Sequence, residues 1–269
     1  MRIPPHGDLT TEALGIGGLP GLLSFSAREP FVLAGGEEAG RLLGRAGATV
    51  RVLRPEGTRV ERGEAILKAQ GSAAALHLGW KPALHMVEYL SGIATRTRRL
   101  VEAARAASSG REVPIAATRK TFPGTRDLAL RAIRAGGGIA HRLGLSDSIL
   151  IFAQHTAFLG ASGLGAAIAR VRTRQPERKL VVEVCGLDEA LAAVHWRADV
   201  VQVEKLPPQQ FAELVAACRS AADRPLLAAT GGIDESNAAA YAQAGADLIV
   251  TSAPYSARPV EVQVTLVPC

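Results

Sequence analysis

From about residue 113 onward, short apolar runs alternate with longer stretches whose apolar residues recur every three or four positions. The short runs, rich in Val, Ile and Leu, predict buried strands, and the longer stretches predict helices. Strands that are apolar throughout and separated by helices are typical of a parallel sheet covered on both faces. The predicted strands cover residues 113–118, 148–152, 180–185, 200–204, 225–230 and 248–251, and the predicted helices cover residues 125–135, 156–173, 188–196, 208–221 and 235–244.

Six strands are too few for a complete eight-stranded α/β barrel, which also needs about 250 residues, more than this part of the chain offers. The pattern therefore leaves an open sheet and an incomplete barrel as alternatives. In either arrangement, chemistry gathers beyond the carboxyl ends of the strands.

The first 80 or so residues follow a different pattern, in which short strands are separated by glycine-containing turns. A long amphipathic helix is predicted to begin at Pro82, because proline suits the first turn of a helix, and to end near Gly110. We therefore predict two domains, residues 1–108 and 109–269, with the final ~15 residues able to rejoin the first domain. The predicted strands of the first domain cover residues 31–36, 49–53 and 64–69, and a short helix covers residues 37–46.

Composition narrows the class of protein. The chain is 48% hydrophobic and 21% charged, which is ordinary for a folded protein with a full core. There are 31 Lys and Arg against 25 Asp and Glu, a net charge of +6. Aromatic residues make up only 4%, too few for the stacking surfaces that bind single-stranded nucleic acid. A small anionic substrate fits this charge better than a nucleic acid.

The cysteines and the apolar runs indicate the compartment. Three widely spaced cysteines with no Cys-x-x-Cys pair indicate neither a zinc site nor a disulfide framework. The first residues lack the apolar segment of a signal peptide, and no apolar run reaches the ~20 residues that span a bilayer. We therefore expect a cytoplasmic protein with no membrane partner.

Polar residues follow the predicted strands, and two of them also interrupt apolar runs. Glu183 and Gln202 each lie inside an apolar strand. A carboxylate in such a strand is costly unless it is paired or coordinated. Glu183 therefore belongs either to a salt bridge with a neighbouring strand or to a binding site. The residues at the strand ends are Thr118-Arg119-Lys120, Gln154-His155, Glu183, Glu204-Lys205, Thr230-Gly231-Gly232 and Thr251-Ser252.

Two groups of residues indicate anion binding. Gly231 and Gly232 precede Asp234, the predicted N-cap of the next helix, and glycines here let backbone N–H groups approach a phosphate. Thr230 and Ser252 add hydroxyl groups from adjacent strand ends, although a plain turn is the alternative. Cations in glycine- or proline-flanked loops favour a second anion, and carboxylates with phosphate oxygens suit Mg²⁺. These loop cations are Arg119, Lys120, His141 and Arg142.

Two long motifs resemble those of the quinolinate phosphoribosyltransferases, also called nicotinate-nucleotide pyrophosphorylases. Residues 117–126 are similar to that family's Thr-Arg-Lys-Thr-x-Pro-Gly-x-Arg segment, and residues 136–147 to its Gly-Gly-Gly-x-x-His-Arg-x-Gly-Leu-x-Asp segment. The resemblance runs from Gly7 to about Ser256. Residues 152–155 are most similar to the ModD branch, the pyrophosphorylases associated with molybdate-transport loci.

The resemblance implies a fold and a reaction. The fold is α/β, with an N-terminal α/β sandwich followed by an incomplete parallel α/β barrel. The donor is phosphoribosyl diphosphate, the acceptor is an acidic heterocycle and the cofactor is Mg²⁺. The family is usually dimeric with an active site at the subunit interface, so we expect a homo-oligomer of at least two subunits.

The resemblance also assigns roles to residues. Arg119, His141 and Arg142 hold the carboxylates of the heterocycle, and Lys120 lies between that substrate and the donor. The donor's ribose is held by Glu183 and Glu204, which also bind magnesium, and its phosphate by the loop Thr230, Gly231 and Gly232. Thr251 and Ser252 are added to the predicted phosphate site because they follow the adjacent strand.

Four positions depart from the family's pattern. Phe152 replaces a substrate-facing lysine, and Lys81 replaces an arginine that a neighbouring subunit contributes. Ala228 replaces a glutamate, and Lys205 an asparagine. Because lysine cannot reproduce the planar fork of arginine, recognition of two carboxylates is weakened. An alternative is that Phe152 turns into the barrel core while Lys205 supplies the missing cation.

The favoured hypothesis is a magnesium-dependent phosphoribosyltransferase whose acceptor is an acidic heterocycle other than quinolinate. A quinolinate enzyme of NAD biosynthesis that tolerates these changes is the first alternative. A non-catalytic phosphate- or oxyanion-binding protein linked to molybdate handling is the second. The retained Lys120, Glu183 and Glu204 favour the enzyme, because anion binding alone has no use for two carboxylates.

Overall fold

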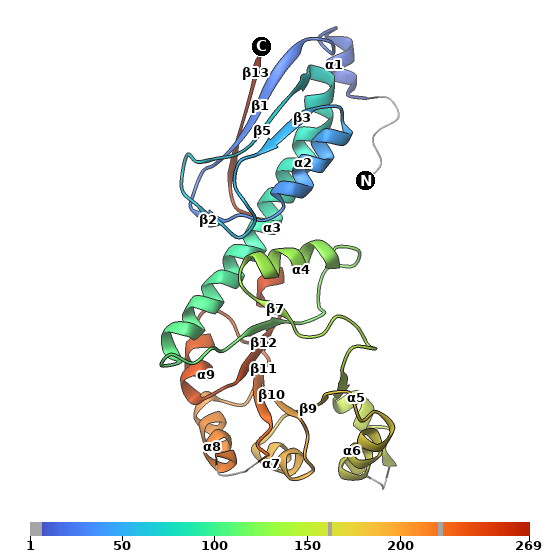
Figure 1. Ribbon diagram of the computed structural model, residues 1–269, viewed down its shortest axis with the longest axis vertical. Helices are drawn as coiled ribbons and strands as arrows, with labels where there is room; N and C mark the ends of the chain where they lie inside the picture. The colour runs from blue at the N-terminus through green and yellow to red at the C-terminus, as the bar shows by residue number, and fades with distance from the viewer. Residues whose placement is uncertain (1–6, 161–162, 220–222) are drawn as a thin grey trace. The chain divides into compact units, whose positions relative to one another are not determined.

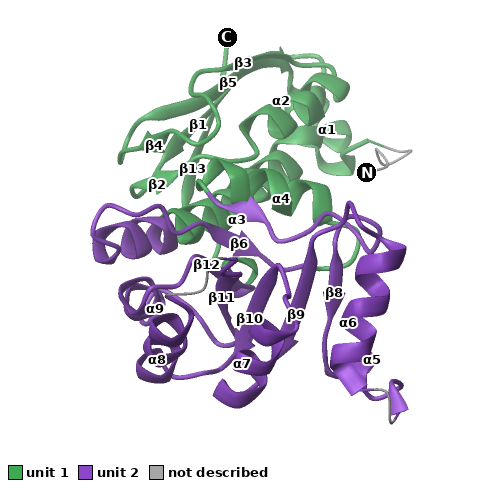
Figure 2. Ribbon diagram, turned by 60° about the horizontal axis from the view of Figure 1, so that its bottom comes forward, with its two compact units in different colours: residues 1–98, 122–137, 254–269 green, residues 99–121, 138–253 purple. Residues whose placement is uncertain are grey.

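The computed structural model describes residues 7–160, 163–219 and 223–269 (Figure 1). The chain forms two compact units, coloured separately in Figure 2. Unit 1 contains residues 1–98, 122–137 and 254–269, and unit 2 contains residues 99–121 and 138–253.

Unit 1 is built on a four-stranded antiparallel sheet with the order β13-β1-β5-β3. Strand β1 pairs with β13, so the end of the chain completes this sheet. Leu23, Phe25 and Leu67 from the sheet pack with Leu76 and Val87 of helix α3 in one buried cluster. The strands are β1 (Pro20–Ala27), β2 (Phe31–Val32), β3 (Thr49–Val52), β4 (Arg59–Val60), β5 (Ala65–Ser72) and β13 (Val262–Pro268), and the helices are α1 (Leu9–Ala13), α2 (Gly36–Arg45), α4 (Arg126–Ala135) and residues 73–98 of α3 (Ala73–Ala107), whose last residues belong to unit 2.

The predicted start of the long helix at Pro82 is wrong. Helix α3 begins at Ala73, directly after β5, and Pro82 lies inside it. Leu76 before the proline and Val87 after it are both fully buried. Their packing holds the helix together across the one backbone hydrogen bond that Pro82 cannot donate.

Unit 2 is an open seven-stranded parallel sheet with the order β7-β6-β12-β11-β10-β9-β8. Helices connect most of its strands, which confirms the prediction of an α/β fold with an incomplete parallel barrel. The strands are β6 (Ile115–Ala117), β7 (Ile139–Ala140), β8 (Ile149–Ile151), β9 (Leu180–Val184), β10 (Val200–Glu204), β11 (Leu226–Thr230) and β12 (Leu248–Thr251), and the helices are α5 (Ala153–Thr156), α6 (Gly163–Arg174), α7 (Leu187–His195), α8 (Pro208–Cys218) and α9 (Ala238–Ala244). A 3-10 turn (Ala253–Ser256) begins at the last residue of unit 2 and continues into unit 1.

Two of the predicted helices differ from the observed ones. The helix predicted over residues 156–173 overlaps α6, which is described from Gly163 onward, and shares only Thr156 with the short helix α5; residues 161–162 lie outside the described part of the chain. Helix α8 is observed to Cys218, and residues 220–221 of its predicted extent also lie outside the description.

The two faces of the parallel sheet carry different side chains because alternate residues of a strand point to opposite faces. Val182, Val201 and Leu227 pack in the large core with residues of α7, α8 and α9. Val181, Val200 and Ala228 form a separate small cluster on the other face, which we name the inner face. Glu183, Gln202, Glu204 and Thr230 lie two or four residues further along the same strands, so they belong to the inner face.

Two aspartates fasten the amino ends of neighbouring strands. Asp199, just before β10, donates its backbone N–H to the Leu180 carbonyl, and its carboxylate accepts the Leu180 N–H at 2.7 Å. Asp247, just before β12, makes the same two bonds with Leu227, the second at 2.8 Å. Each carboxylate also forms an ion pair with an arginine. We call each of these two arrangements, Asp199 with Leu180 and Asp247 with Leu227, an aspartate clasp.

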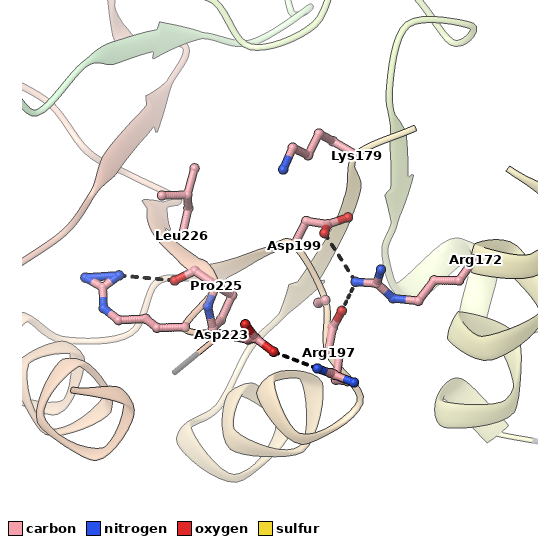
Figure 3. Close-up of a pocket in the computed structure, with 9 residues that line it drawn as sticks. Arg172, Lys179, Arg197, Asp199, Asp223, Pro225 and Leu226 are labelled. Atoms are coloured by element: carbon pink, nitrogen blue, oxygen red, sulfur yellow. Dashed lines mark hydrogen bonds and ion pairs between the residues drawn. The ribbon is translucent and has the colours of Figure 1, made fainter. Parts of the chain in front are cut away.

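A cavity of about 620 Å³ lies at this amino end of the sheet (Figure 3). Arg172 contacts Asp199 there, and Arg197 pairs with Asp223 at 2.7 Å. These partners belong to the sheet's own framework, and the amino ends of barrel strands serve stability rather than catalysis. We therefore place the active site at the opposite ends of the strands.

Among the helices of the described chain, none has both the length and the apolar character to cross a membrane.

Candidate active site

The carboxyl ends of the parallel strands carry the residues with chemistry. All of the predicted site residues except Lys81 belong to unit 2, in the strands or in the loops that follow them. Lys81 lies in the part of α3 that belongs to unit 1, is exposed, and holds its Nζ atom 4.6 Å from the centre of the Trp80 ring. Its predicted role in a partner subunit stays a prediction.

Glu183 and Gln202 face each other across two neighbouring strands. They are paired in register between β9 and β10. The Gln202 amide Nε2 donates a hydrogen bond to the Glu183 carboxylate. This contact gives the half-buried carboxylate a partner without neutralising it, so Glu183 is not part of the salt bridge between strands that was the structural alternative. Among the described residues, no cation is paired with it.

Glu204 ends strand β10 and is partly open to solvent. Its side chain is 38% exposed and lies 3.6 Å from the ammonium group of Lys205, which is itself 73% exposed. The pKa of the nearby Cys185 thiol reflects these charges. Burial raises this pKa, and the negative charges of Glu204, Glu189 and Glu183 raise it further. The predicted carboxylates therefore gather around one point at the ends of β9 and β10.

The glycine pair after β11 is shaped by Glu204 and Lys205. Gly231 has φ of +87°, and a Cβ atom there would lie 2.7 Å from Glu204 Cγ and 2.8 Å from Lys205 Cγ. Gly232 has φ of +70° and open space where a Cβ would project. Only glycine fits the first position, and the second leaves room for a ligand close to the backbone.

The segment after this glycine pair differs from the prediction. Asp234 does not cap the helix: its carboxylate accepts the Ser236 N–H at 2.9 Å, and α9 begins only at Ala238, after Asn237. The Asn237 side chain accepts the Asp234 N–H and donates to the Gly232 carbonyl. These short-range bonds compete with helix formation and hold the turn in place.

The strand-end threonines already have partners. The buried Thr230 hydroxyl donates to the Val250 carbonyl at 3.0 Å, and the buried Thr251 hydroxyl donates to the Ile233 carbonyl at 2.6 Å. Both bonds tie the glycine turn to the neighbouring strand, which favours a positioning role. Phosphate contact by these two hydroxyls, and by the half-buried Ser252 that follows, stays a prediction.

The cations gather beside the ends of β6 and β7. Arg119 and Lys120 are exposed, and the Lys120 N–H donates to the Thr118 hydroxyl at 3.3 Å. Arg142 is half-buried; burial and the charge of Arg119 lower its guanidinium pKa, while Asp147 raises it. Burial and Arg142 lower the pKa of His141, and the side chain of Gln202 raises it. Mutual repulsion of these groups means that an anion binding among them would be stabilised.

Phe152 directly follows β8 and packs on its own helical turn. The half-buried ring lies edge-on to the His155 imidazole, with ring centres 4.3 Å apart. The His155 Nδ1 atom also faces the Phe152 N–H at 3.4 Å. Residues 152–156 include neither a lysine nor an arginine.

Glu183 and Glu204 supply oxygen ligands of the kind that Mg²⁺ prefers. Within the described residues no three His, Cys, Asp or Glu side chains gather as a complete metal site. A magnesium ion needs few carboxylates when phosphate oxygens and water complete its shell. The donor set thus fits an ion that arrives with a phosphorylated substrate.

These features together describe an incomplete α/β barrel that carries carboxylates, a glycine turn and clustered cations at the carboxyl ends of its strands. This combination is typical of an enzyme that binds a phosphorylated substrate. Residues 8–91 match the sequence profile of the quinolinate phosphoribosyl transferase N-terminal domain, and residues 93–265 that of its C-terminal domain. The chain therefore belongs to the quinolinate phosphoribosyltransferase family and is a phosphoribosyltransferase.

Individual relatives agree with this assignment. The chain is 47% identical to the "Putative pyrophosphorylase ModD" of Rhodobacter capsulatus, over 90% of this chain and 92% of that one. It is 34% identical to the nicotinate-nucleotide pyrophosphorylase (carboxylating) of Mycobacterium leprae, over 91% and 86% of the two chains. The solved nicotinate-nucleotide pyrophosphorylase of Francisella tularensis superposes with a TM-score of 0.88 at 25% identity, over 97% of this chain and 91% of that one.

Proposed function

We propose that the protein transfers phosphoribose from phosphoribosyl diphosphate to a ring nitrogen of an acidic heterocycle other than quinolinate. The observation that carries this proposal is the meeting of Glu183, Glu204 and the Gly231 turn at one end of the sheet. Two carboxylates suit vicinal ribose hydroxyls, and the turn suits a phosphate. The presence of both beside a cation cluster favours a bisubstrate enzyme over a simple anion-binding protein.

In the proposed reaction the acceptor's ring nitrogen bonds to the anomeric carbon of the ribose. The bond from that carbon to the diphosphate oxygen breaks, and its electron pair leaves with the diphosphate. Glu183 and Glu204 orient the ribose as positive charge develops, and Lys120 stabilises the departing diphosphate. Mg²⁺ held by the two glutamates and the donor's oxygens would neutralise the leaving group when it is bound.

The acceptor half supports an acid other than quinolinate. Arg119, His141 and Arg142 remain to bind a carboxylate, but Phe152 puts an apolar ring where the family has a lysine. Lys205 extends into solvent beside Glu204 and is paired with it. Its charge is thus partly committed to the donor half, which argues against its replacing the lost lysine.

Two other functions are kept as alternatives. The relationship to the Mycobacterium leprae protein favours quinolinate turnover as the second candidate. An oxyanion-binding protein without catalysis is the third. As a further proposal, the family resemblance supports a homodimer in which Lys81 reaches the partner's site, and a cytoplasmic location fits the soluble substrates.

Release of diphosphate separates these functions. The purified protein is mixed with Mg²⁺, phosphoribosyl diphosphate and each of a panel of pyridine, pyrimidine and pterin acids. The expected result is release with one acid other than quinolinate, abolished in Lys120→Ala and retained in Lys179→Ala, a matched lysine at the far end of the strands. Release with quinolinate at comparable rates supports the second candidate, and binding of the donor without release by any acid supports the third.

A further inference from the structure

Gln202 is a buried polar side chain in the middle of the site, with 3% of its surface exposed. Its Nε2 atom donates to the Glu183 carboxylate. Because an ionised carboxylate can only accept, this bond fixes which end of the carboxamide faces β9. The Oε1 atom must therefore face away from Glu183.

The Oε1 atom is buried and forms no hydrogen bond within the described part of the chain. Strand β11 lies on the other side of β10 from β9. Its residue in register with Gln202 is Ala228, which has no polar side chain. A buried carbonyl left without a partner is costly, so the fold must gain something from keeping it.

The imidazole of His141 is the group that Oε1 can serve. His141 follows β7, whose partner β6 receives the His141 N–H at the Ala117 carbonyl. The Gln202 side chain raises the pKa of His141 as a neighbouring hydrogen-bond acceptor does, so the two groups lie side by side, although Oε1 makes no fully formed hydrogen bond. Burial and the charge of Arg142 lower the pKa of His141 more than Gln202 raises it, which favours the neutral ring.

We propose that Gln202 is a positioning residue that holds the single proton of His141 against its Oε1 atom. Oε1 can only accept, so the ring nitrogen that faces it carries the proton. The other ring nitrogen then meets the substrate as a hydrogen-bond acceptor. Glu183 sets this arrangement through Nε2, which links the ribose side of the site to the heterocycle side.

This inference rests on the proposed function only for the chemistry of the ligand. An acceptor-type His141 beside Arg119 and Arg142 suits a heterocycle that presents an N–H or O–H group next to its carboxylate. Quinolinate, ionised at neutral pH, has no such donor. The substrate class is therefore acidic heterocycles that carry a lactam N–H, an amino group or a hydroxyl.

The experiment reads the His141 tautomer directly, without any substrate. The protein is labelled with ¹⁵N-histidine, and two-bond ¹H–¹⁵N spectra are recorded at pH 7.5, with His141 assigned from the His141→Gln variant. Gln202→Met removes both polar atoms at similar volume. Gln209→Met makes the same change on the exposed surface of α8 and serves as the control.

A single neutral tautomer in the wild type and in Gln209→Met, changing to a mixture in Gln202→Met, is the expected result. A mixed or doubly protonated ring in the wild type overturns the proposal, even if Gln202→Met does not fold. An unchanged tautomer in folded Gln202→Met overturns it as well. Best turnover of an acid without any N–H or O–H donor overturns the substrate class, whereas failure to bind phosphoribosyl diphosphate counts against the proposed function alone.

Discussion

The Glu204 side chain fills the space into which a side chain at residue 231 would project: a Cβ atom on Gly231 would lie 2.7 Å from Glu204 Cγ. The carboxylate on β10 and the turn after β11 are thus a single packed unit. Moving either of them displaces the other, so the ribose and phosphate ends of the proposed donor site are coupled by sterics.

Substitution of Gly231 by alanine tests this packing. The variant combines a strained positive φ with a steric clash, so we expect a loss of about 1–3 kcal/mol in unfolding free energy. We also expect at least about tenfold weaker calorimetric binding of magnesium phosphoribosyl diphosphate. Gly186→Ala is the control, because its φ of −135° is ordinary and its Cβ would meet open space. Equal effects of the two changes would contradict the coupling.

Loss of the Glu204 carboxylate is expected to separate binding from stability. Its exposed pair with Lys205 contributes about 0–1 kcal/mol, so Glu204→Gln should unfold at nearly the same denaturant concentration. Donor binding should weaken sharply, because the amide keeps one acceptor oxygen but lacks the negative charge that we propose holds the ribose hydroxyls and Mg²⁺. Glu213→Gln, an exposed change on α8, should leave both measurements unaltered. Undiminished donor affinity in Glu204→Gln would remove this residue from the site.

The carboxylates should also control the chemistry of Cys185. Burial and the charges of Glu204, Glu189 and Glu183 raise the thiol pKa, so less of the reactive thiolate is present at neutral pH. Alkylation of Cys185, followed by mass spectrometry, should therefore keep accelerating above the pH at which an ordinary thiol levels off. Glu204→Gln should shift this rise to lower pH. A profile that does not differ between wild type and variant would contradict the clustering of these carboxylates.

Quinolinate should be a poor substrate. One charged hydrogen bond lost with the family's lysine costs ~1.5–3 kcal/mol, a penalty of roughly 10- to 150-fold in kcat/KM. Phe152→Lys should recover part of it, whereas Phe158→Lys, at a residue that is 89% exposed, should not. Wild-type turnover of quinolinate at ~1 s⁻¹ or more would refute this prediction.

Lys81 is expected to act in the site of a partner subunit. Lys81→Ala and Lys120→Ala should each be inactive, and a mixture refolded together should regain activity, because one site in a mixed dimer is then intact. Light scattering at micromolar concentration should give the mass of at least a dimer. A fully active monomer would exclude the role in trans.

The elements that were predicted correctly are those whose local sequence pattern favours a single type of secondary structure. β10 and β12 have the predicted bounds because an apolar run buried on both faces permits no other element. β1 was missed because its segment contains Pro20, Gly21 and two serines, and its partner β13 lies at the far end of the chain. Local patterns carry no information about such distant pairing.

The site divides in the same way. Its position followed from topology, since the carboxyl ends of parallel strands converge. The Gln202–Glu183 bond depends on the register of β9 and β10, which sequence alone does not give. Gln202 was visible as a polar residue in an apolar strand, but its unpaired oxygen was not. The use of the Thr230 and Thr251 hydroxyls by the backbone was hidden for the same reason.

The aspartate clasps at Leu180 and Leu227 bear on how this protein can change. They fix the alignment of their strands at the amino end, opposite the end where we propose the active site. A slip of alignment would carry every inner-face residue to a new height, and the clasps oppose it whatever stands at the other end. Residues at the carboxyl ends of the strands can therefore change without altering this alignment. Exchanges such as that at residue 152 would let evolution, or a protein engineer, explore new acceptors while the barrel keeps its register.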